Sequence, residues 1–525
     1  MPIESLTVLL VLIGLIVAIT WLARRLRILD PVLLTLAGIV LSFITIFPTI
    51  ELDPKLVLLF VLPPLVYSAA VDLPWEDFRG NMRPISLFAV GLVLATSAAV
   101  ASVAHAFIPR LSWAEAFALG AIVSPTDTVA STAVSDRLGL PRRLLAIMQG
   151  EGLVNDAVAL TLLRVATAAI LARTFSPTTA VLRFAAIIIL EPLYGAAIGW
   201  LATNIRRKIA DARVEVAVSL LTPFLAFLIP EALGGSGVLA TVSAGMYVSL
   251  RAPELVSSET RLSLAGTWDV LIFLLEGALF LLTGMQFRAI IHGAPGLRGF
   301  HTLAAAAAVT GAVIILRFVW TWPAIWLTYR FPGIIGDQSR LPNRQVTFLA
   351  WCGMRGGISL AAALSLSTLV PSRNLILFIT ACVIVGTLIF QGGSLPFLLR
   401  KLSLDKDARL ERGEALGLEH EARMEAVAGA LESLGHRGVE ASPIRDEYEH
   451  RLDMLRRHAD EEQDVGPAGY RKDLLRIRMD TLAVERGKIL NMHREGRLPE
   501  HVMHRIERDI DLREVRLRQL VSARD

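Results

Sequence analysis

Three carboxylates lie inside stretches of the chain that are otherwise apolar enough to cross a membrane. Asp127 ends the sequence Ser-Pro-Thr-Asp, and Glu151 and Asp156 bound the sequence Glu-Gly-Leu-Val-Asn-Asp. A charged side chain is costly at that depth and is rare there unless it serves an ion or proton path. Oxygen ligands suit hard cations such as sodium, and burial favours the protonated form of a carboxyl group. A carboxylate that holds either a proton or a sodium ion is sufficient for exchange of the two.

The spacing of the polar residues directs several of them toward one small space. Thr126 and Asp127 follow a proline, and a helix broken at a proline leaves carbonyl groups free to bind a cation. Glu151 and Asn155 are four residues apart and share one helix face, whereas Asp156 points toward a neighbouring helix. The sequence therefore predicts three acids and an amide around one site.

These acids are expected to differ in role. A structural alternative to ion binding is that they pair with buried arginines and hold helices together. We expect Glu151 to form such an ion pair with Arg355 rather than to bind the ion directly. Asp156 has no basic residue within one helical turn, so ion exchange is the expected role for this residue. Asp127 is intermediate between the two.

Two further arginines, Arg164 and Arg317, also lie in apolar segments. Either could pair with an acid, contact the ligand residues without touching the ion, or extend its guanidinium group toward the membrane surface. The sequence does not choose among these roles.

The composition defines the class of protein. The 525 residues are 54% hydrophobic, and the mean hydropathy of +0.56 indicates a polytopic membrane protein. The net charge is +4 and the basic residues are dispersed over loops, which argues against a nucleic-acid partner. The two cysteines, Cys352 and Cys382, form no motif with other ligands, so we expect neither a disulfide framework nor a metal site.

The elements that must position the acids are membrane-spanning helices. About thirteen stretches are long and apolar enough to span: 6–23, 31–48, 55–71, 84–108, 113–135, 144–171, 180–203, 214–230, 235–250, 267–287, 302–329, 345–369 and 374–399. Ser124-Pro125 interrupts the fifth stretch, and the glycine-rich segment 353–357 interrupts the twelfth. The two interrupted helices are seven apart and run in opposite directions, as two inverted repeats of six helices would produce.

The loops carry a strong charge asymmetry, which predicts the orientation of the chain. Lys and Arg gather in the loops on the side of Arg24 and Arg25, so the N-terminus is expected outside and the C-terminus inside. The composition changes after about residue 400 to a charged sequence with apolar residues at helical spacing. We therefore predict a membrane domain over 1–400 and a cytoplasmic helical tail over 401–525.

Several motifs together resemble one known family. They are Leu-Pro-Pro-Leu-Val-Tyr at 62–67, Ser-Pro-Thr-Asp at 124–127, Glu-Gly-Leu-Val-Asn-Asp at 151–156, Phe-Leu-Leu-Thr-Gly-Met at 280–285 and Gly-Met-Arg-Gly-Gly-Ile-Ser-Leu-Ala at 353–361. In these motifs the chain resembles the monovalent cation:proton antiporter-1 family, and specifically its bacterial sodium/proton antiporters. The resemblance covers residues 1 to 400 and none of the tail.

The resemblance implies a secondary transporter rather than an enzyme, with a moving six-helix core flanked by helices that form a homodimer. Helices five and twelve would cross at their unwound centres. By match to the motifs, Asp156 is implied as the exchanging carboxylate, and Thr126 and Asp127 as sodium ligands beside it. Glu151 is again implied as the partner of Arg355.

The same resemblance implies one-for-one, electroneutral exchange, because the family pairs asparagine with aspartate at the positions of Asn155 and Asp156. Glu276 matches a glutamate of animal exchangers and is either a residue that supports the ligands or an exposed residue of the cavity wall. The transported Na⁺ and H⁺ are the only ions implied, with no cofactor, and the implied location is the bacterial plasma membrane.

Three alternatives stay open. Potassium or lithium could use the same oxygen ligands as sodium. An intramembrane aspartyl protease could use Asp127 and Asp156 as a pair that shares a proton, but the chain lacks the Gly-x-Gly-Asp motif of such proteases. A channel is the third alternative, although broken helices with buried acids suit alternating access better than an open pore.

Overall fold

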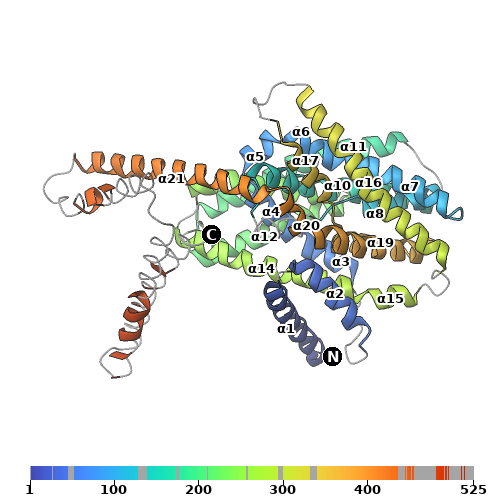
Figure 1. Ribbon diagram of the computed structural model, residues 1–525, viewed down its shortest axis with the longest axis horizontal. Helices are drawn as coiled ribbons and strands as arrows, with labels where there is room; N and C mark the ends of the chain where they lie inside the picture. The colour runs from blue at the N-terminus through green and yellow to red at the C-terminus, as the bar shows by residue number, and fades with distance from the viewer. Residues whose placement is uncertain are drawn as a thin grey trace. The chain divides into compact units, whose positions relative to one another are not determined.

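The structure, a computed structural model, describes residues 2–435 except 27, 45–51, 128–138, 173–176, 210, 256–257, 294–298 and 331–339, and beyond 435 mainly 446–450 and 481–489. Within these residues every regular element is a helix (Figure 1). They divide into two compact units, Met1–Glu411 and Arg412–Asp525. The predicted assignment of 1–400 to the membrane and of 401–525 to the cytoplasm stays a prediction.

The first unit is built from helices of very different length. In chain order they are α1 (Pro2–Leu26), α2 (Asp30–Ser42), α3 (Pro54–Leu56), η1 (Val57–Val61), α4 (Leu62–Asp72), α5 (Trp75–Gly80), α6 (Met82–Ser86), η2 (Leu87–Leu92), α7 (Val93–Phe107), α8 (Trp113–Val123), α10 (Arg142–Ala172), α11 (Pro177–Arg206), α12 (Ala212–Ala232), α13 (Val238–Leu255), α14 (Ser258–Met285), α15 (Phe287–His292), α16 (Phe300–Arg330), α17 (Asn343–Trp351), α18 (Gly357–Leu364), α19 (Arg373–Thr387), η3 (Leu388–Gly392), α20 (Gly393–Lys401) and the start of α21 (Leu404–Gly435). The elements η1, η2 and η3 are single π-helical turns inside longer helices.

The predicted all-α membrane fold is confirmed. Within the described residues, nine helical segments are long and apolar enough to cross a membrane, and three shorter apolar helices accompany them. Each of the thirteen predicted stretches overlaps a described helix. The number of segments that cross the membrane and the inverted repeats stay predictions.

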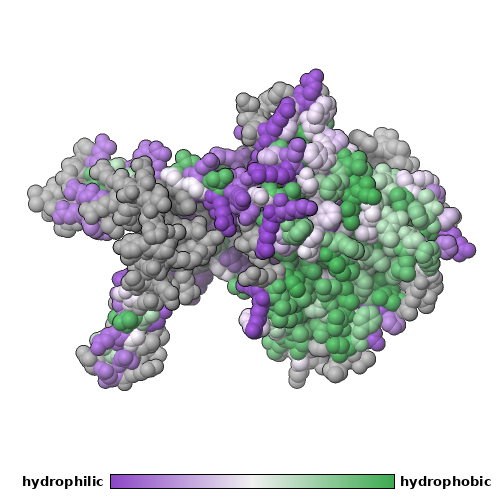
Figure 2. Space-filling model, in the orientation of Figure 1, coloured by the Kyte–Doolittle hydropathy of each residue, from purple (hydrophilic) through white to green (hydrophobic). Residues whose placement is uncertain are grey.

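The surface of the first unit is apolar over much of its helical face, as Figure 2 shows. Large side chains such as Leu193, Ile315 and Trp326 are more than 60% exposed on these helices. A water-soluble protein rarely exposes so many large apolar side chains in one region, whereas lipid chains are a suitable environment for them.

The helices of the first unit pack as two groups. One, the core group, comprises α6, α7, α8, α10 and α16–α20 with η2 and η3, and its members pack chiefly against one another. The other, the flanking group, comprises α1, α2, α4 and α11–α14. The two groups meet along α10, which packs against α4 and α13, and along α18, which packs against α14.

Glycines bring helices of the flanking group into main-chain contact. A Cβ at Gly38 of α2 would overlap the carbonyl oxygen of Leu281 in α14, and one at Gly284 would overlap the carbonyl oxygen of Thr35. A Cβ at Gly195 of α11 would likewise overlap the main chain of α13. Small residues allow such close approach, which is how helices associate where there is no water to drive apolar surfaces together.

The first two turns of α21 are tied to two helices of the core group. Arg344 at the start of α17 pairs with Asp407 at 2.7 Å. The backbone amide of Arg142 at the start of α10 donates to a carboxylate oxygen of Glu411 at 2.8 Å. In the second unit, Arg486 in the helix at 481–489 pairs with Glu514 at 2.8 Å.

Both predicted interruptions are present where the sequence places them. The helix α8 ends at Val123, and residues 126–127 have no regular structure. Residues 352–356 separate α17 from α18. The remainder of the predicted fifth span, 128–135, lies outside the described residues.

Candidate ion-binding site

Four of the predicted ligands lie together, on α10 and on the segment that follows α8. Thr126 and Asp156 are each 8% exposed and Asn155 is 1% exposed, while Asp127 is half-buried. The backbone amide of Asp127 donates to the carbonyl oxygen of Met354 at 2.8 Å, so the two interrupted helices meet at their breaks.

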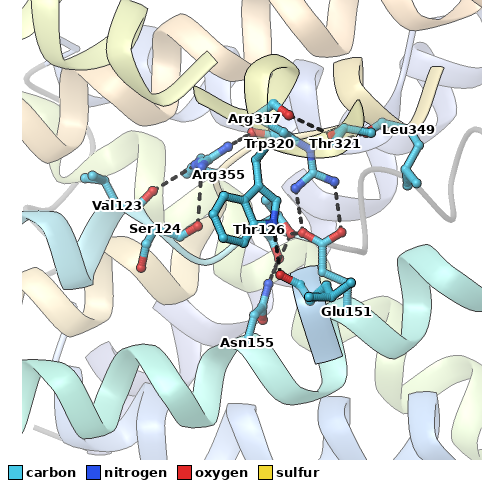
Figure 3. A network of polar contacts seen from close by, with 12 residues as sticks. Val123, Ser124, Thr126, Glu151, Asn155, Arg317, Trp320, Thr321, Leu349 and Arg355 are labelled. Atoms are coloured by element: carbon cyan, nitrogen blue, oxygen red, sulfur yellow. Dashed lines mark hydrogen bonds and ion pairs between the residues drawn. The ribbon is translucent and has the colours of Figure 1, made fainter. Parts of the chain in front are cut away.

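A chain of hydrogen bonds holds Thr126 in place (Figure 3). The Thr126 hydroxyl donates to Oε1 of Glu151 at 2.9 Å and accepts from Nδ2 of Asn155 at 3.1 Å. The same Nδ2 lies 3.3 Å from the Thr126 carbonyl oxygen. Asn155 Oδ1 has no hydrogen-bond partner within the described part of the chain, which leaves a buried acceptor beside the break.

Glu151 pairs with Arg317 of α16 and not with Arg355. The contact is bidentate, with Nη1 2.5 Å from Oε1 and Nη2 2.9 Å from Oε2, and both side chains are at most 2% exposed. Arg317 Nε also lies 3.3 Å from the carbonyl oxygen of Leu349. Because two parallel N–H···O bonds satisfy both carboxylate oxygens, this arginine neutralises the Glu151 charge.

Arg355 instead donates hydrogen bonds to backbone carbonyl groups at the helix breaks, so the predicted pairing of Arg355 with Glu151 is wrong. Its Nε donates to the carbonyl oxygen of Val123 at 2.8 Å and its Nη2 to that of Ser124 at 3.3 Å, while Nη1 contacts the carbonyl of Gly353. These carbonyl groups have no helical donor, since α8 ends there and α17 has already ended. In a membrane an unsatisfied carbonyl is costly, so the guanidinium group is needed at the breaks rather than at Glu151.

The π-helical turn η2 fixes the position of Arg317. The indole Nε1 of Trp320, one turn after Arg317, donates to the carbonyl oxygen of Leu87 at 3.0 Å. The guanidinium carbon of Arg317 lies 5.8 Å from the ring centre of Phe88. A π-turn frees backbone acceptors within a helix, and here one of them holds α16 in register. Sequence reasoning missed this support, because no local pattern links Trp320 to Leu87.

Gly356 allows the Asp127 side chain to lie against the unwound segment. A Cβ at this position would overlap the Asp127 carboxylate. The close contact between the Asp127 carboxylate and residue 356 therefore requires glycine. Through this contact the carboxylate of one broken helix lies against the backbone of the other.

A cavity of about 870 Å³ borders this site. Its walls include Thr126, Asp127 and Asp156 from the core group and Glu276 from α14. The carboxylates that line it are Asp30, Asp72, Asp127, Asp156, Asp269 and Glu276, and Arg24 is the only basic residue among its described lining residues. Such a cavity attracts cations and leads them to buried oxygen atoms.

The remaining predicted residues are placed as follows. Glu276 is a half-buried residue of the cavity wall. Arg164 lies away from the site, with its Nη2 2.5 Å from Oε1 of Glu231. Of the two arginines whose roles the sequence left open, Arg317 thus joins the site and Arg164 does not.

Comparisons with known proteins identify the family of the chain. Residues 9–401 match the family described as sodium/hydrogen exchanger, transmembrane. An uncharacterised Na⁺/H⁺ exchanger of Mycobacterium tuberculosis is 32% identical, over 98% of this chain and 96% of its own. An antiporter of Bacillus pumilus, named for the exchange of sodium, potassium, lithium and rubidium for H⁺, is 28% identical over 87% of this chain and 70% of its own. The fold matches the sodium proton antiporter MjNhaP1 of Methanocaldococcus jannaschii with a TM-score of 0.59 and 16% identity, over 76% of this chain and 99% of that one. The chain therefore belongs to the sodium/hydrogen exchanger family.

Proposed function

We propose that this protein exchanges sodium for protons across a membrane by alternating access, with Asp156 as the group that carries either ion. The observation that supports this most directly is the state of Asp156. It lines an acidic cavity, is 8% exposed, and has no hydrogen bond or ion pair with any described residue. A buried carboxylate without a fixed partner has to take up a proton or a cation.

Neighbouring oxygen atoms complete the proposed sodium site. Asp127 and Thr126 contribute from the break after α8, and Asn155 holds Thr126 by its amide nitrogen while its Oδ1 has no partner among the described residues. Sodium prefers such oxygen ligands. The two half-broken helices supply backbone groups at the same place.

The charge balance supports one-for-one exchange. Glu151 is neutralised by Arg317, and Asn155 carries no charge. In this proposal Asp127 keeps its charge throughout the cycle, and Asp156 alone carries one sodium ion or one proton in each direction. The protein is a transporter and not an aspartyl protease in this proposal, in accord with relatives that are named as exchangers.

A wider cation range is a second candidate. The Bacillus pumilus relative is named for sodium, potassium, lithium and rubidium, and oxygen ligands do not by themselves separate these ions. Sodium remains the first choice because the family and the Mycobacterium tuberculosis relative are named for it.

The membrane location, oligomeric state and orientation of the chain are also proposed. We place the protein in the bacterial plasma membrane as a homodimer, with the N-terminus outside and residues 401–525 in the cytoplasm. The basic residues Arg24 and Arg25 then face the cytoplasm, as the positive-inside rule requires. The acidic cavity, which Arg24 lines, would open to that side.

Proton flux in proteoliposomes tests the function. A sodium gradient should drive proton movement with the parent protein, and Asp156→Asn should abolish it while the protein stays folded. Asp269→Asn is the matched control, since Asp269 lines the same cavity on α14 away from the breaks. Exchange that persists in Asp156→Asn overturns the role of Asp156. The same assay with potassium and lithium decides the cation range.

A further inference from the structure

Arg164 connects the two helix groups at a point beyond the ion site. It lies eight residues after Asp156 on α10, about 12 Å along the helix axis. Its Nη2 lies 2.5 Å from Oε1 of Glu231, at the end of α12, and its Nη1 donates to the carbonyl oxygen of Gly235, between α12 and α13. A helix of the core group is thus fastened to α12 of the flanking group and to the loop that follows it.

The loop that receives Arg164 is held in one shape. Gly234 and Gly237 have φ of +86° and +65°, which other residues rarely adopt. Ser236 donates from its backbone amide to Oε1 of Glu191 at 2.6 Å and from its hydroxyl to Oε2 at 3.0 Å. Glu191 is only 5% exposed, and a Cβ at Gly235 would overlap its carboxylate. The loop therefore presents the Gly235 carbonyl as a fixed acceptor on α11–α13.

The cavity lies beside the first half of α10. Arg142, at the start of α10, pairs with Asp77 of α5 at 2.8 Å, so α10 begins near the end of α4. The cavity is lined by the last residue of α4, Asp72, and by four residues of α10: Gln149, Gly152, Leu153 and Asp156. The cavity therefore lies between the groups beside the first half of α10, and Arg164 fastens them beside its second half.

The exposure of the Arg164 pair suits a contact that opens and closes. The side chains of Arg164 and Glu231 are 36% and 29% exposed, whereas those of Arg317 and Glu151 are at most 2% exposed. The exposed surface of this pair leaves room for other hydrogen-bonding groups to replace the contact when it separates. Separation of the buried pair would leave two charges without solvent.

We propose that Arg164, Glu231 and the carbonyl of Gly235 form a latch that holds the groups together beside the second half of α10 and opens in every transport cycle. The inference rests on the proposed alternating access. The latch stabilises the form with the cavity open and adds nothing to the form in which the other side is open. Its removal should shift the population toward that second form.

A labelling experiment tests this shift without any measurement of transport. Gln149 lies on the cavity wall, so the rate at which Gln149→Cys reacts with a membrane-impermeant maleimide reports access to the cavity. The labelling of the parent protein, which contains the native Cys352 and Cys382, is subtracted as background. Arg164→Gln in this background should lower the labelling rate about fivefold, and Glu231→Gln should lower it less, because the Gly235 contact remains. Arg344→Gln is the control, since it removes a similarly exposed pair between α17 and α21 and should leave the rate unchanged.

A cross-link tests whether the latch must open. In Arg164→Cys/Glu231→Cys, a bifunctional methanethiosulfonate reagent should stop exchange, and a reductant should restore it. An unchanged labelling rate in Arg164→Gln overturns the latch, as does full exchange in the completely cross-linked protein. Absence of exchange in the parent protein would instead refute the proposed function, and the labelling rates would still be measurable.

Discussion

Asp127 and Met354 join the two broken helices through their backbones, by an N–H···O bond of 2.8 Å. The bond needs neither side chain, so it fixes the relative position of the breaks whatever ion is bound. The side chains of Thr126 and Asp127 both line the cavity.

Glu151 and Arg317 should be strongly coupled in stability. Either Glu151→Gln or Arg317→Met leaves an uncompensated buried charge, which costs about 3–5 kcal/mol, so each should lower the thermal midpoint sharply. The double variant should be more stable than the worse single variant. Asp77→Asn is the control, because its partner Arg142 is 72% exposed and the loss should be at most about 1 kcal/mol. A double variant as unstable as the worse single one would show that the pair does not act as a unit.

Arg355 should be required for its forked shape and not only for its charge. Lys in its place keeps the charge but cannot reach the carbonyl groups of Val123 and Ser124 together. Arg355→Lys should therefore unfold at a lower temperature than the parent in the same detergent. A thermal midpoint equal to that of the parent would mean that a positive charge alone suffices at this position.

Gly356→Ala should impair ion binding. The added methyl group would displace the Asp127 carboxylate, and a misplacement of about 1 Å at a functional group can cost on the order of a hundredfold in rate. Gly393→Ala is the matched control, because a Cβ there meets no atom within 4 Å. Sodium-driven proton flux should fall at least tenfold in the first variant and stay near the parent value in the second. Equal rates in both would show that Asp127 takes no part in transport.

Protons and sodium should compete for the carrier. If both bind Asp156, protons bound to the carrier exclude sodium, so the apparent sodium affinity should weaken as the pH falls. In the acidic limit the apparent affinity should decrease about tenfold per pH unit, because one proton is exchanged for one sodium ion. Initial rates at several sodium concentrations and pH values measure this relation. A sodium affinity independent of pH over the whole active range contradicts a shared carrier.

The membrane potential should not drive exchange. One sodium ion against one proton moves no net charge, whereas a potential of 100 mV acts with about 2.3 kcal/mol on each elementary charge moved. In vesicles with the potential clamped by valinomycin and potassium, the end point should depend only on the sodium and proton gradients. If the end point shifts with the clamped potential, a second acid titrates during transport, and Asp127 and Glu276 are the first to replace.

The parts of the site that could be predicted are those set by local sequence. A proline fixes where a helix breaks, and helical spacing fixes which of Glu151, Asn155 and Asp156 share a face, so the composition of the site followed from two short segments. The all-α membrane fold followed from the length of the apolar stretches.

The partner of Glu151 could not be predicted in this way. Arg317 and Arg355 both lie in apolar segments far along the chain from Glu151, and spacing says nothing about which one meets it. The choice depends on the rotation of α16, which is held by a hydrogen bond from Trp320 to a carbonyl of the π-turn η2. It depends equally on the carbonyl groups at the breaks, which take the donors of Arg355.

The glycine contacts within the flanking group permit less relative movement of the helices than the glycine contacts between the two groups. Where Gly38 and Gly284 meet, main chain lies directly on main chain, and no rotamer change can let one helix slip past the other. Across the boundary, Gly357 of α18 faces the side chains of Leu279 and Thr283. Side chains can change rotamer and allow one helix to slide against the other, whereas backbones in direct contact cannot. Shear within the α2–α14 pair is therefore blocked, and any displacement that closes the cavity has to occur along the seam where side chains separate the two groups.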